Sequence, residues 1–174
     1  MFEEKRRRWI PISIAVLGFI WTLPQAVLGQ QDVAGMPEHH LGYTVQSLRG
    51  NYAAIATYGG NAARALGVQV FDGAGNLKGS AIVNQPGPDG TRSVVSISFT
   101  GTYTVNGDGT GVMSLTITLP NGTTADATED FVITKAKLRD RVLIATEVID
   151  AQEQPSTVSP GGVFVTHTYT RRPE

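Results

Sequence analysis

Three ionisable residues lie in phase with apolar neighbours in segments typical of β-strands. They are Glu129, Glu147 and His167. Because side chains alternate between the two faces of a strand, all three point into an apolar interior if those faces are the inner ones. Burial raises the proton affinity of a carboxylate, and histidine titrates near neutral pH, so the three are candidate catalytic residues for general acid–base chemistry. A bulge or register slip would instead turn each side chain to solvent.

Arg64 has a similar placement, on one face with Leu66, Val68 and Val70. An inward-pointing Arg64 would pair with a glutamate or bind a ligand carboxylate through two hydrogen bonds. Its place at the first position of a strand predicts the alternative, an arginine at the rim of the fold.

The other motifs predict neither a metal nor a cofactor. His39 and His40 are adjacent, so on an extended segment they point in opposite directions and rarely reach one ion. The chain has 0 cysteines, which excludes thiolate ligands. The segments 72–76 and 106–110 resemble the start of calcium-binding loops. Such a loop needs a bidentate glutamate at its twelfth position, but that position holds Val83 in the first segment and Ile117 in the second. These segments therefore predict turns.

The elements that must position these residues are short strands separated by glycine-rich turns. Segments such as Asp72–Asn76 supply the positive φ values that tight hairpins need, and strands such as Val112–Leu119 alternate apolar and polar residues. A long run of strands with short connections predicts an all-β fold, a single antiparallel up-and-down β-barrel of about eight or nine strands. The predicted strands are Gly50–Tyr58, Arg64–Phe71, Leu77–Asn84, Arg92–Phe99, Gly101–Val105, Thr110–Leu119, Thr124–Lys135, Arg141–Ile149 and Val163–Thr170.

The inner face of such a barrel is the predicted ligand-binding surface. Small residues on the first strands, such as Ala54 and Ala56, favour a cavity, although they would equally permit tight coiling of the strands. The residues expected to contact a ligand are Tyr52, Arg64, Phe99, Tyr103, Met113, Leu115 and Phe131.

The first residues are typical of an export signal. Four basic residues at 5–8 precede the apolar segment 9–21, and small residues at 27 and 29 fit a cleavage site, so we expect residues 1–29 to be a cleaved signal peptide. Residues 30–47 lack periodicity and predict a tail or strap, followed by the barrel domain at 48–174. The expected location is secreted or periplasmic, with no stable membrane span after cleavage. The net charge of −1, with no basic patch, argues against a nucleic-acid partner.

Three segments in order resemble a recurrent family of exported bacterial proteins of largely unknown function. They are SLRGNY at 47–52, VFDGAGNL at 70–77 and FTGTYTVNGDGTG at 99–111. The resemblance implies a small barrel similar to calycins, which are lipocalin-like barrels, and to the allene oxide cyclase barrel. Gly50-Asn51-Tyr52 also resembles the Gly-x-Trp of lipocalin first strands, where a late arginine packs across the aromatic ring. Arg171 or Arg172 would take that part here.

Three functions remain open on the sequence. The first is binding of a small, mainly hydrophobic molecule inside the barrel. The second is a cyclase or isomerase of the allene oxide cyclase type, in which Glu129, Glu147 or His167 would assist proton movement. The third is a non-catalytic surface or extracellular-matrix interaction protein. The sequence decides neither between them nor between a monomer and a homo-oligomer.

Overall fold

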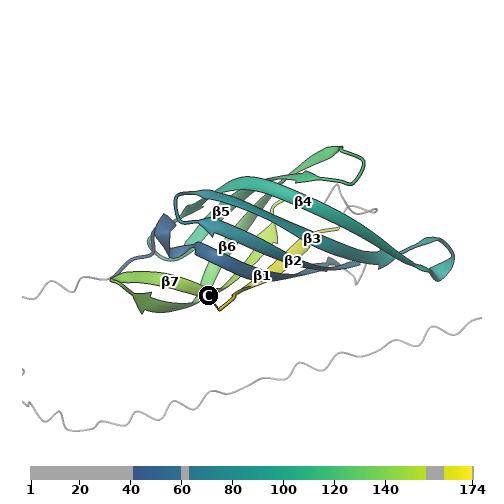
Figure 1. Cartoon of the computed structure of the whole chain (residues 1–174). Helices are drawn as coiled ribbons and strands as arrows, with labels where there is room; N and C mark the ends of the chain where they lie inside the picture. The colour runs from purple at the N-terminus through teal and green to yellow at the C-terminus, as the bar shows by residue number, and fades with distance from the viewer. Residues whose placement is uncertain (1–40, 60–62, 156–162, 174) are drawn as a thin grey trace, which may run out of the picture. The chain divides into compact units, whose positions relative to one another are not determined.

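The computed structural model describes residues 41–59, 63–155 and 163–173, which contain eight strands. Each strand pairs antiparallel with the next, and the last pairs with the first, so the sheet closes as an up-and-down barrel (Figure 1). This confirms the predicted fold class. The strands are β1 (Arg49–Tyr58), β2 (Ala63–Asp72), β3 (Asn76–Pro86), β4 (Arg92–Val105), β5 (Thr110–Thr118), β6 (Thr124–Arg139), β7 (Val142–Gln152) and β8 (Val165–Arg171).

The strands predicted at Arg92–Phe99 and Gly101–Val105 form a single strand in the structure, which is β4. β4 runs without a break through Gly101, where the sequence suggested a boundary. Gly101 is opposite Leu115 of β5, and a Cβ atom on it would lie 2.1 Å from the carbonyl oxygen of Ser114. The glycine therefore permits a close backbone approach within the sheet and is not a turn residue.

Replacing Gly101 with alanine is expected to destabilise the barrel. The atoms in the way belong to the backbone of β5, which cannot move without distorting the ladder. Overpacking of this kind costs about 1–3 kcal/mol. Urea unfolding of Gly101→Ala should show this loss, whereas Gly107→Ala, with nothing within 4 Å of the new Cβ, is the matched control. Equal midpoints for the two variants would contradict the explanation.

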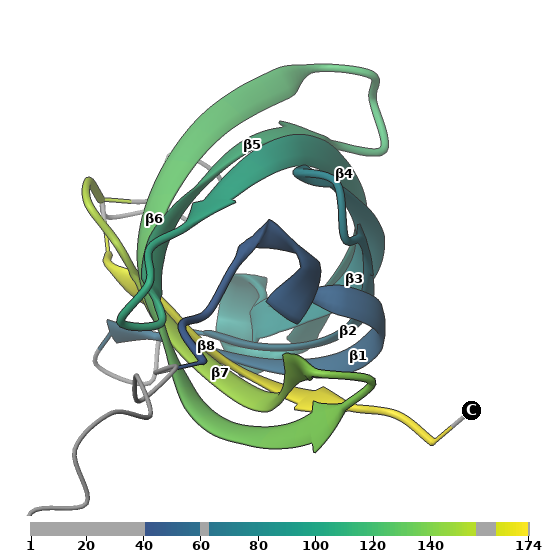
Figure 2. The same ribbon diagram turned by 90° about the vertical axis from the view of Figure 1, so that its left-hand side faces the viewer.

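One end of the barrel is covered by the residues that precede β1. The short 3₁₀-helix η1 (Val45–Ser47) lies across this end, inside the ring of strands (Figure 2). The hydroxyl of Tyr103 donates to the carbonyl of Leu48 at 2.6 Å and accepts from the backbone N–H of Gly73. Ser47 and Leu48 are fully buried. The described part of the predicted tail thus acts as the strap, while the predicted signal peptide lies outside the described residues.

The barrel is closed by β1 and β8, which lie far apart in sequence. The Arg171 guanidinium donates to the carbonyl of Arg49, which lies 122 positions earlier in the chain, and packs against Gly50. Arg171 also lies close enough to Tyr52 to lower its pKa, although burial raises that pKa overall. Of the two late arginines singled out in the sequence, Arg171 lies beside the first-strand aromatic.

The hydrophobic core lies inside the barrel. A T-shaped aromatic contact joins Phe71 to Tyr52 with ring centroids 5.3 Å apart, and a second joins Phe71 to Tyr103 at 5.1 Å. The outer face carries some exposed apolar side chains, among them Leu66 and Ile82, which are cross-strand neighbours on β2 and β3. Within the described ranges, no helix combines the length and hydropathy needed to cross a bilayer.

Candidate functional site

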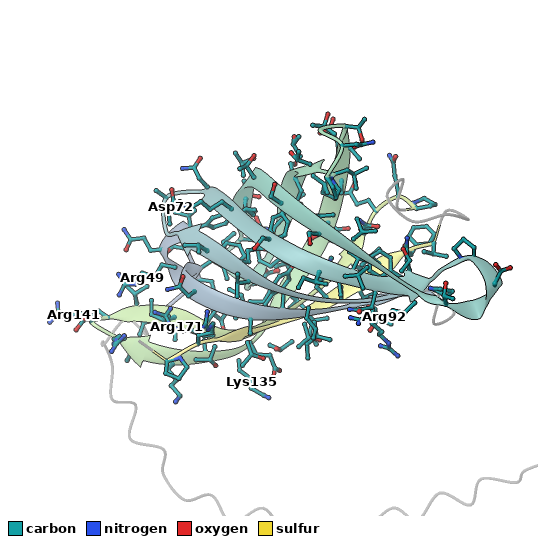
Figure 3. The ribbon with its side chains drawn as sticks, turned by 45° about the vertical axis from the view of Figure 1, so that its right-hand side comes forward. Arg49, Asp72, Arg92, Lys135, Arg141 and Arg171 are labelled. Carbon is teal, nitrogen blue, oxygen red and sulfur yellow. The ribbon has the colours of Figure 1, made fainter. Side chains whose placement is uncertain are left out.

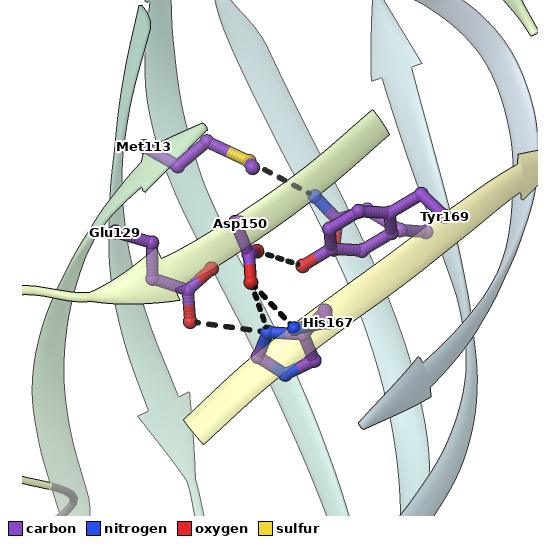
Figure 4. Close-up of polar contacts among 6 residues, drawn as sticks. Met113, Glu129, Asp150, His167 and Tyr169 are labelled. Atoms are coloured by element: carbon purple, nitrogen blue, oxygen red, sulfur yellow. Dashed lines mark hydrogen bonds and ion pairs between the residues drawn. The ribbon is translucent and has the colours of Figure 1, made fainter. Parts of the chain in front are cut away.

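Four polar side chains from the last three strands meet inside the barrel. Glu129 comes from β6, Asp150 from β7, and His167 and Tyr169 from β8. Asp150 and His167 are directly opposite each other in the β7–β8 ladder, so the register alone brings them together. Glu129, Asp150 and Tyr169 are each at most 3% exposed, and the side chain of His167 is 17% exposed. We call these four residues the interior cluster (Figure 4).

Asp150 is the centre of the interior cluster. Its Oδ1 accepts hydrogen bonds from the backbone N–H of His167 at 2.7 Å and from Nδ1 of the same residue at 2.8 Å. Its Oδ2 accepts from the hydroxyl of Tyr169 at 2.8 Å (Figure 4). Burial alone would raise the pKa of Asp150, but the charge on His167 and these hydrogen bonds hold it below its usual value. Asp150 is therefore a buried anion.

The pKa values of both His167 and Glu129 are raised beside this anion. Burial lowers the pKa of His167, but the hydrogen bond and charge of Asp150 outweigh it, so that the net pKa is raised. Burial raises the pKa of Glu129 to about 8, with the His167 charge partly opposing it. The Glu129 carboxyl is thus mainly neutral at pH 7, and its Oε1 lies 3.7 Å from Nδ1 of His167.

A cavity of about 40 Å³ lies next to the interior cluster. Its apolar wall contains small residues of β1 and β2, including Ala54, Ala56 and Ala65. Its polar wall contains Glu129 and His167. The lining continues to Tyr58 and Ile117, which lie at the strand ends opposite η1. The small residues of the first strands therefore open space inside the barrel, as the cavity interpretation of the sequence predicts.

Two buried oxygens beside this cavity have no hydrogen-bond partner among the described residues. They are Oε2 of Glu129 and Oε1 of Gln152. Glu129 and Gln152 are direct partners in the β6–β7 ladder, and both line the cavity. A buried polar atom without a partner costs about 1–3 kcal/mol, so this pair of oxygens is a site where a bound polar group would be stabilised.

Two of the three predicted catalytic residues face the interior, and the third does not. Glu129 and His167 point inward, but Glu147 lies on the outer surface, where it accepts from Lys135 at 2.9 Å and from Thr134 at 2.9 Å. Figure 3 shows Lys135 on the outside of the barrel. Of the two orientations that the sequence left open for Glu147, the structure has the solvent-facing one, because the β6–β7 ladder shifts register on both sides of Lys135. The shift reverses the inner and outer faces of β7.

The predicted ligand-binding residues divide into three groups. Phe99 and Leu115 line the cavity. Tyr52, Tyr103, Met113 and Phe131 are buried in the core but are not among the cavity residues, and Tyr103 holds the N-terminal strap. Arg64 lies on the outer surface near the start of β2 and donates to Thr57. The inward alternative for Arg64 is therefore wrong, because the face that it shares with Leu66 is the solvent face.

The sequence did not identify Asp150, Tyr169 or Gln152 as residues of the site. The strand predicted at Arg141–Ile149, which corresponds to β7, ended one residue before Asp150. After the register shift, Val148, Asp150 and Gln152 alternate inward while Ile149 and Ala151 point outward. Counting every second residue backward from Gln152 would have placed Gln152 and Asp150 on one face of β7. The sequence of β7 alone does not show that His167 of β8 lies opposite Asp150.

One nitrogen or oxygen of each of Glu129, Asp150 and His167 lies within 4.8 Å of the others, which is close enough for three ligands of a metal ion. Asp150 and His167 are however hydrogen-bonded to each other, and both Asp150 oxygens already accept hydrogen bonds. A metal ion would have to break the hydrogen bond between Asp150 and His167. The arrangement therefore favours proton chemistry.

Comparison with known proteins does not identify a relative. No protein-family model matches the chain, and searches of curated proteins and of solved structures gave no match. The features of the molecule that indicate a function are therefore the interior cluster and the cavity.

Proposed function

We propose that the barrel binds a small, mainly hydrophobic molecule in its interior. The observation that carries the proposal is the cavity that has an apolar wall of small residues and ends at two buried oxygens without protein partners. Ligand pockets are typically apolar with a few placed polar groups, which is the composition found here. The polar groups would fix the orientation of the molecule.

The size of the cavity limits the kind of molecule. Pockets for drug-sized ligands measure about 300–1,000 Å³, whereas this cavity measures about 40 Å³. The lining extends from the interior cluster to Tyr58 at the end of β1. A slim chain with its polar end at Glu129 fits these dimensions better than a bulky ring system.

Filling the cavity is expected to abolish binding without unfolding the barrel. Ala56→Leu adds a larger side chain to the cavity wall, while Ala53→Leu adds the same group on the exposed face of the same strand. Native mass spectrometry of protein purified from its own host should show a retained molecule in the wild type and in Ala53→Leu only. Retention by Ala56→Leu, or its absence from all three proteins, would contradict the proposal.

The second candidate is the isomerase or cyclase function, and one specific observation favours it. The neutral carboxyl of Glu129 lies beside an apolar cavity and within 3.7 Å of His167, whose charge is balanced by Asp150. A proton on Glu129 is thus close to a bound molecule, and the charge of His167 would stabilise the carboxylate that remains after the proton is transferred. Positioned proton donors of this kind contribute about 10²–10⁴-fold to reaction rates.

Proton transfer can be tested without the natural substrate. The α-hydrogens of 2-hexanone exchange with D₂O when an acid such as Glu129 protonates the carbonyl oxygen and a base, here solvent water, removes a proton from the α-carbon. The catalytic function predicts faster α-deuteration with the wild-type protein than with Glu129→Gln, by about 10²-fold or more, as measured by mass spectrometry. Equal rates for wild type, Glu129→Gln and buffer would exclude proton transfer to a bound ketone.

A further inference from the structure

The two unpartnered oxygens form one recognition element. Glu129 and Gln152 face each other across the β6–β7 ladder, and their exposed fractions are 1% and 8%. Directly opposed side chains have Cβ atoms about 4.5–5.5 Å apart, so one small polar group can reach both. The two oxygens differ in kind, since one belongs to a carboxyl and the other to an amide.

The hydrogen-bonding capacity of the pair is complementary. A neutral carboxyl has one O–H donor, and Oε1 of Glu129 already faces His167. Asp150 and Gln152 lie near the same carboxyl and influence its pKa, but Oε2 has no partner at hydrogen-bond distance in the described part of the chain and can present the O–H to the cavity. Oε1 of Gln152 can only accept. A ligand group that satisfies both oxygens must accept one hydrogen bond and donate another.

The charge of the surroundings restricts the ligand further. Asp150 and His167 balance each other, and no lysine or arginine is among the described residues that line the cavity. The other titratable groups that line it are Tyr58 and Tyr169, from β1 and β8. An anionic ligand would have no free counter-charge, and a buried anion without one is costly. The ligand group must therefore be neutral.

We propose that the cavity selects a neutral molecule with a hydroxyl group on a slim aliphatic chain, in which the hydroxyl accepts from Glu129 and donates to Gln152. This inference rests on the proposed binding function and specifies its ligand class. An alcohol satisfies both oxygens at once, because its hydroxyl group both accepts and donates a hydrogen bond. A ketone would leave Gln152 unpaired, a hydrocarbon would leave both unpaired, and a carboxylate would add an uncompensated charge.

Matched six-carbon probes test this order. Binding of 1-hexanol, 2-hexanone, n-hexane and hexanoate to the purified protein can be followed by NMR of labelled methyl groups, since Ala54, Ala56 and Ala65 line the cavity. We expect the Kd of 1-hexanol to be about tenfold or more below that of 2-hexanone, because one unpaired buried group costs about 1–3 kcal/mol. Hexanoate should bind most weakly. Cyclohexanol tests the slim shape and should bind more weakly than 1-hexanol.

Variants of the two residues separate this inference from the binding function. Gln152→Met removes the acceptor at similar length and should abolish the preference for 1-hexanol over 2-hexanone, while n-hexane binding is retained. Asp130→Asn, on the exposed face beside Glu129, is the control and should keep the preference. Equal binding of 1-hexanol and n-hexane by the wild type would overturn the ligand class but leave the binding function standing. No binding of any probe would overturn both.

Discussion

Asp150→Ala is expected to cause the largest loss of stability of any single substitution in the interior cluster, about 3–5 kcal/mol in the free energy of unfolding. The carboxylate accepts from the His167 backbone and ring and from Tyr169. Its removal leaves three buried donors without an acceptor and leaves the charge of His167 without its partner. Urea denaturation followed by circular dichroism would measure the loss.

A graded variant makes this expectation testable even if Asp150→Ala fails to fold. Tyr169→Phe removes only one donor to Asp150 and should lower the free energy of unfolding by about 1 kcal/mol. Asp130→Ala, on the outer face of β6, should leave the unfolding midpoint unchanged. If Asp150→Ala were as stable as Asp130→Ala, Asp150 would not be the buried anion that organises the cluster.

The barrel is expected to become less stable as the pH rises from about 5 to 8. The pKa of Glu129 is near 4.5 in the unfolded chain and about 8 in the folded protein. Between these values the folded state holds a proton that the unfolded state has lost, so the free energy of unfolding falls by up to about 1.4 kcal/mol per pH unit. The raised pKa of His167 acts in the same direction above its ordinary value of 6.5.

Glu129→Gln should remove this dependence between pH 5 and 6.5, where the His167 contribution is still small, and should raise stability at pH 8. The carboxylates whose pKa is lowered, including Asp150 and Glu147, are ionised in both states in this range and do not contribute to the slope. Glu147→Gln is therefore the control and should keep the wild-type slope. Thermal unfolding across the pH range would measure both. A wild type whose stability rises over this range would contradict the buried neutral carboxyl.

Local alternation in the sequence predicted the inner faces of the regular strands. Met113 and Leu115 on β5, Glu129 on β6 and His167 on β8 point inward as expected, because these strands keep a period of two. The same rule failed for Glu147, because the register shift depends on the pairing of β7 with β6. The register shift is determined by how β6 and β7 pair with each other. Near the shift both faces of β7 are largely apolar, so the sequence of β7 alone does not reveal it.

The cluster itself could be predicted only in part. Glu129 and His167 were identified as candidates from their phase, but their proximity to Asp150 depends on strand order and register. Small residues on β1 indicated a cavity, and Ala54 and Ala56 do line it. A strap was one of the two interpretations of residues 30–47, but its position across one end of the barrel was not predicted, because residues 45–47 carry no periodic pattern. The hydrogen bonds of Tyr103 that hold this segment come from a distant strand.

The closure of β1 on β8 has a consequence for folding kinetics. The interior cluster is assembled from the last three strands, and its polar groups remain hydrated until β8 pairs with β1 across nearly the whole domain. Such a pairing has a high contact order, which slows folding because a long loop must close first. Expulsion of water from Asp150 and His167 would then coincide with the final step. Substitutions in the cluster should therefore change the unfolding rate more than the refolding rate.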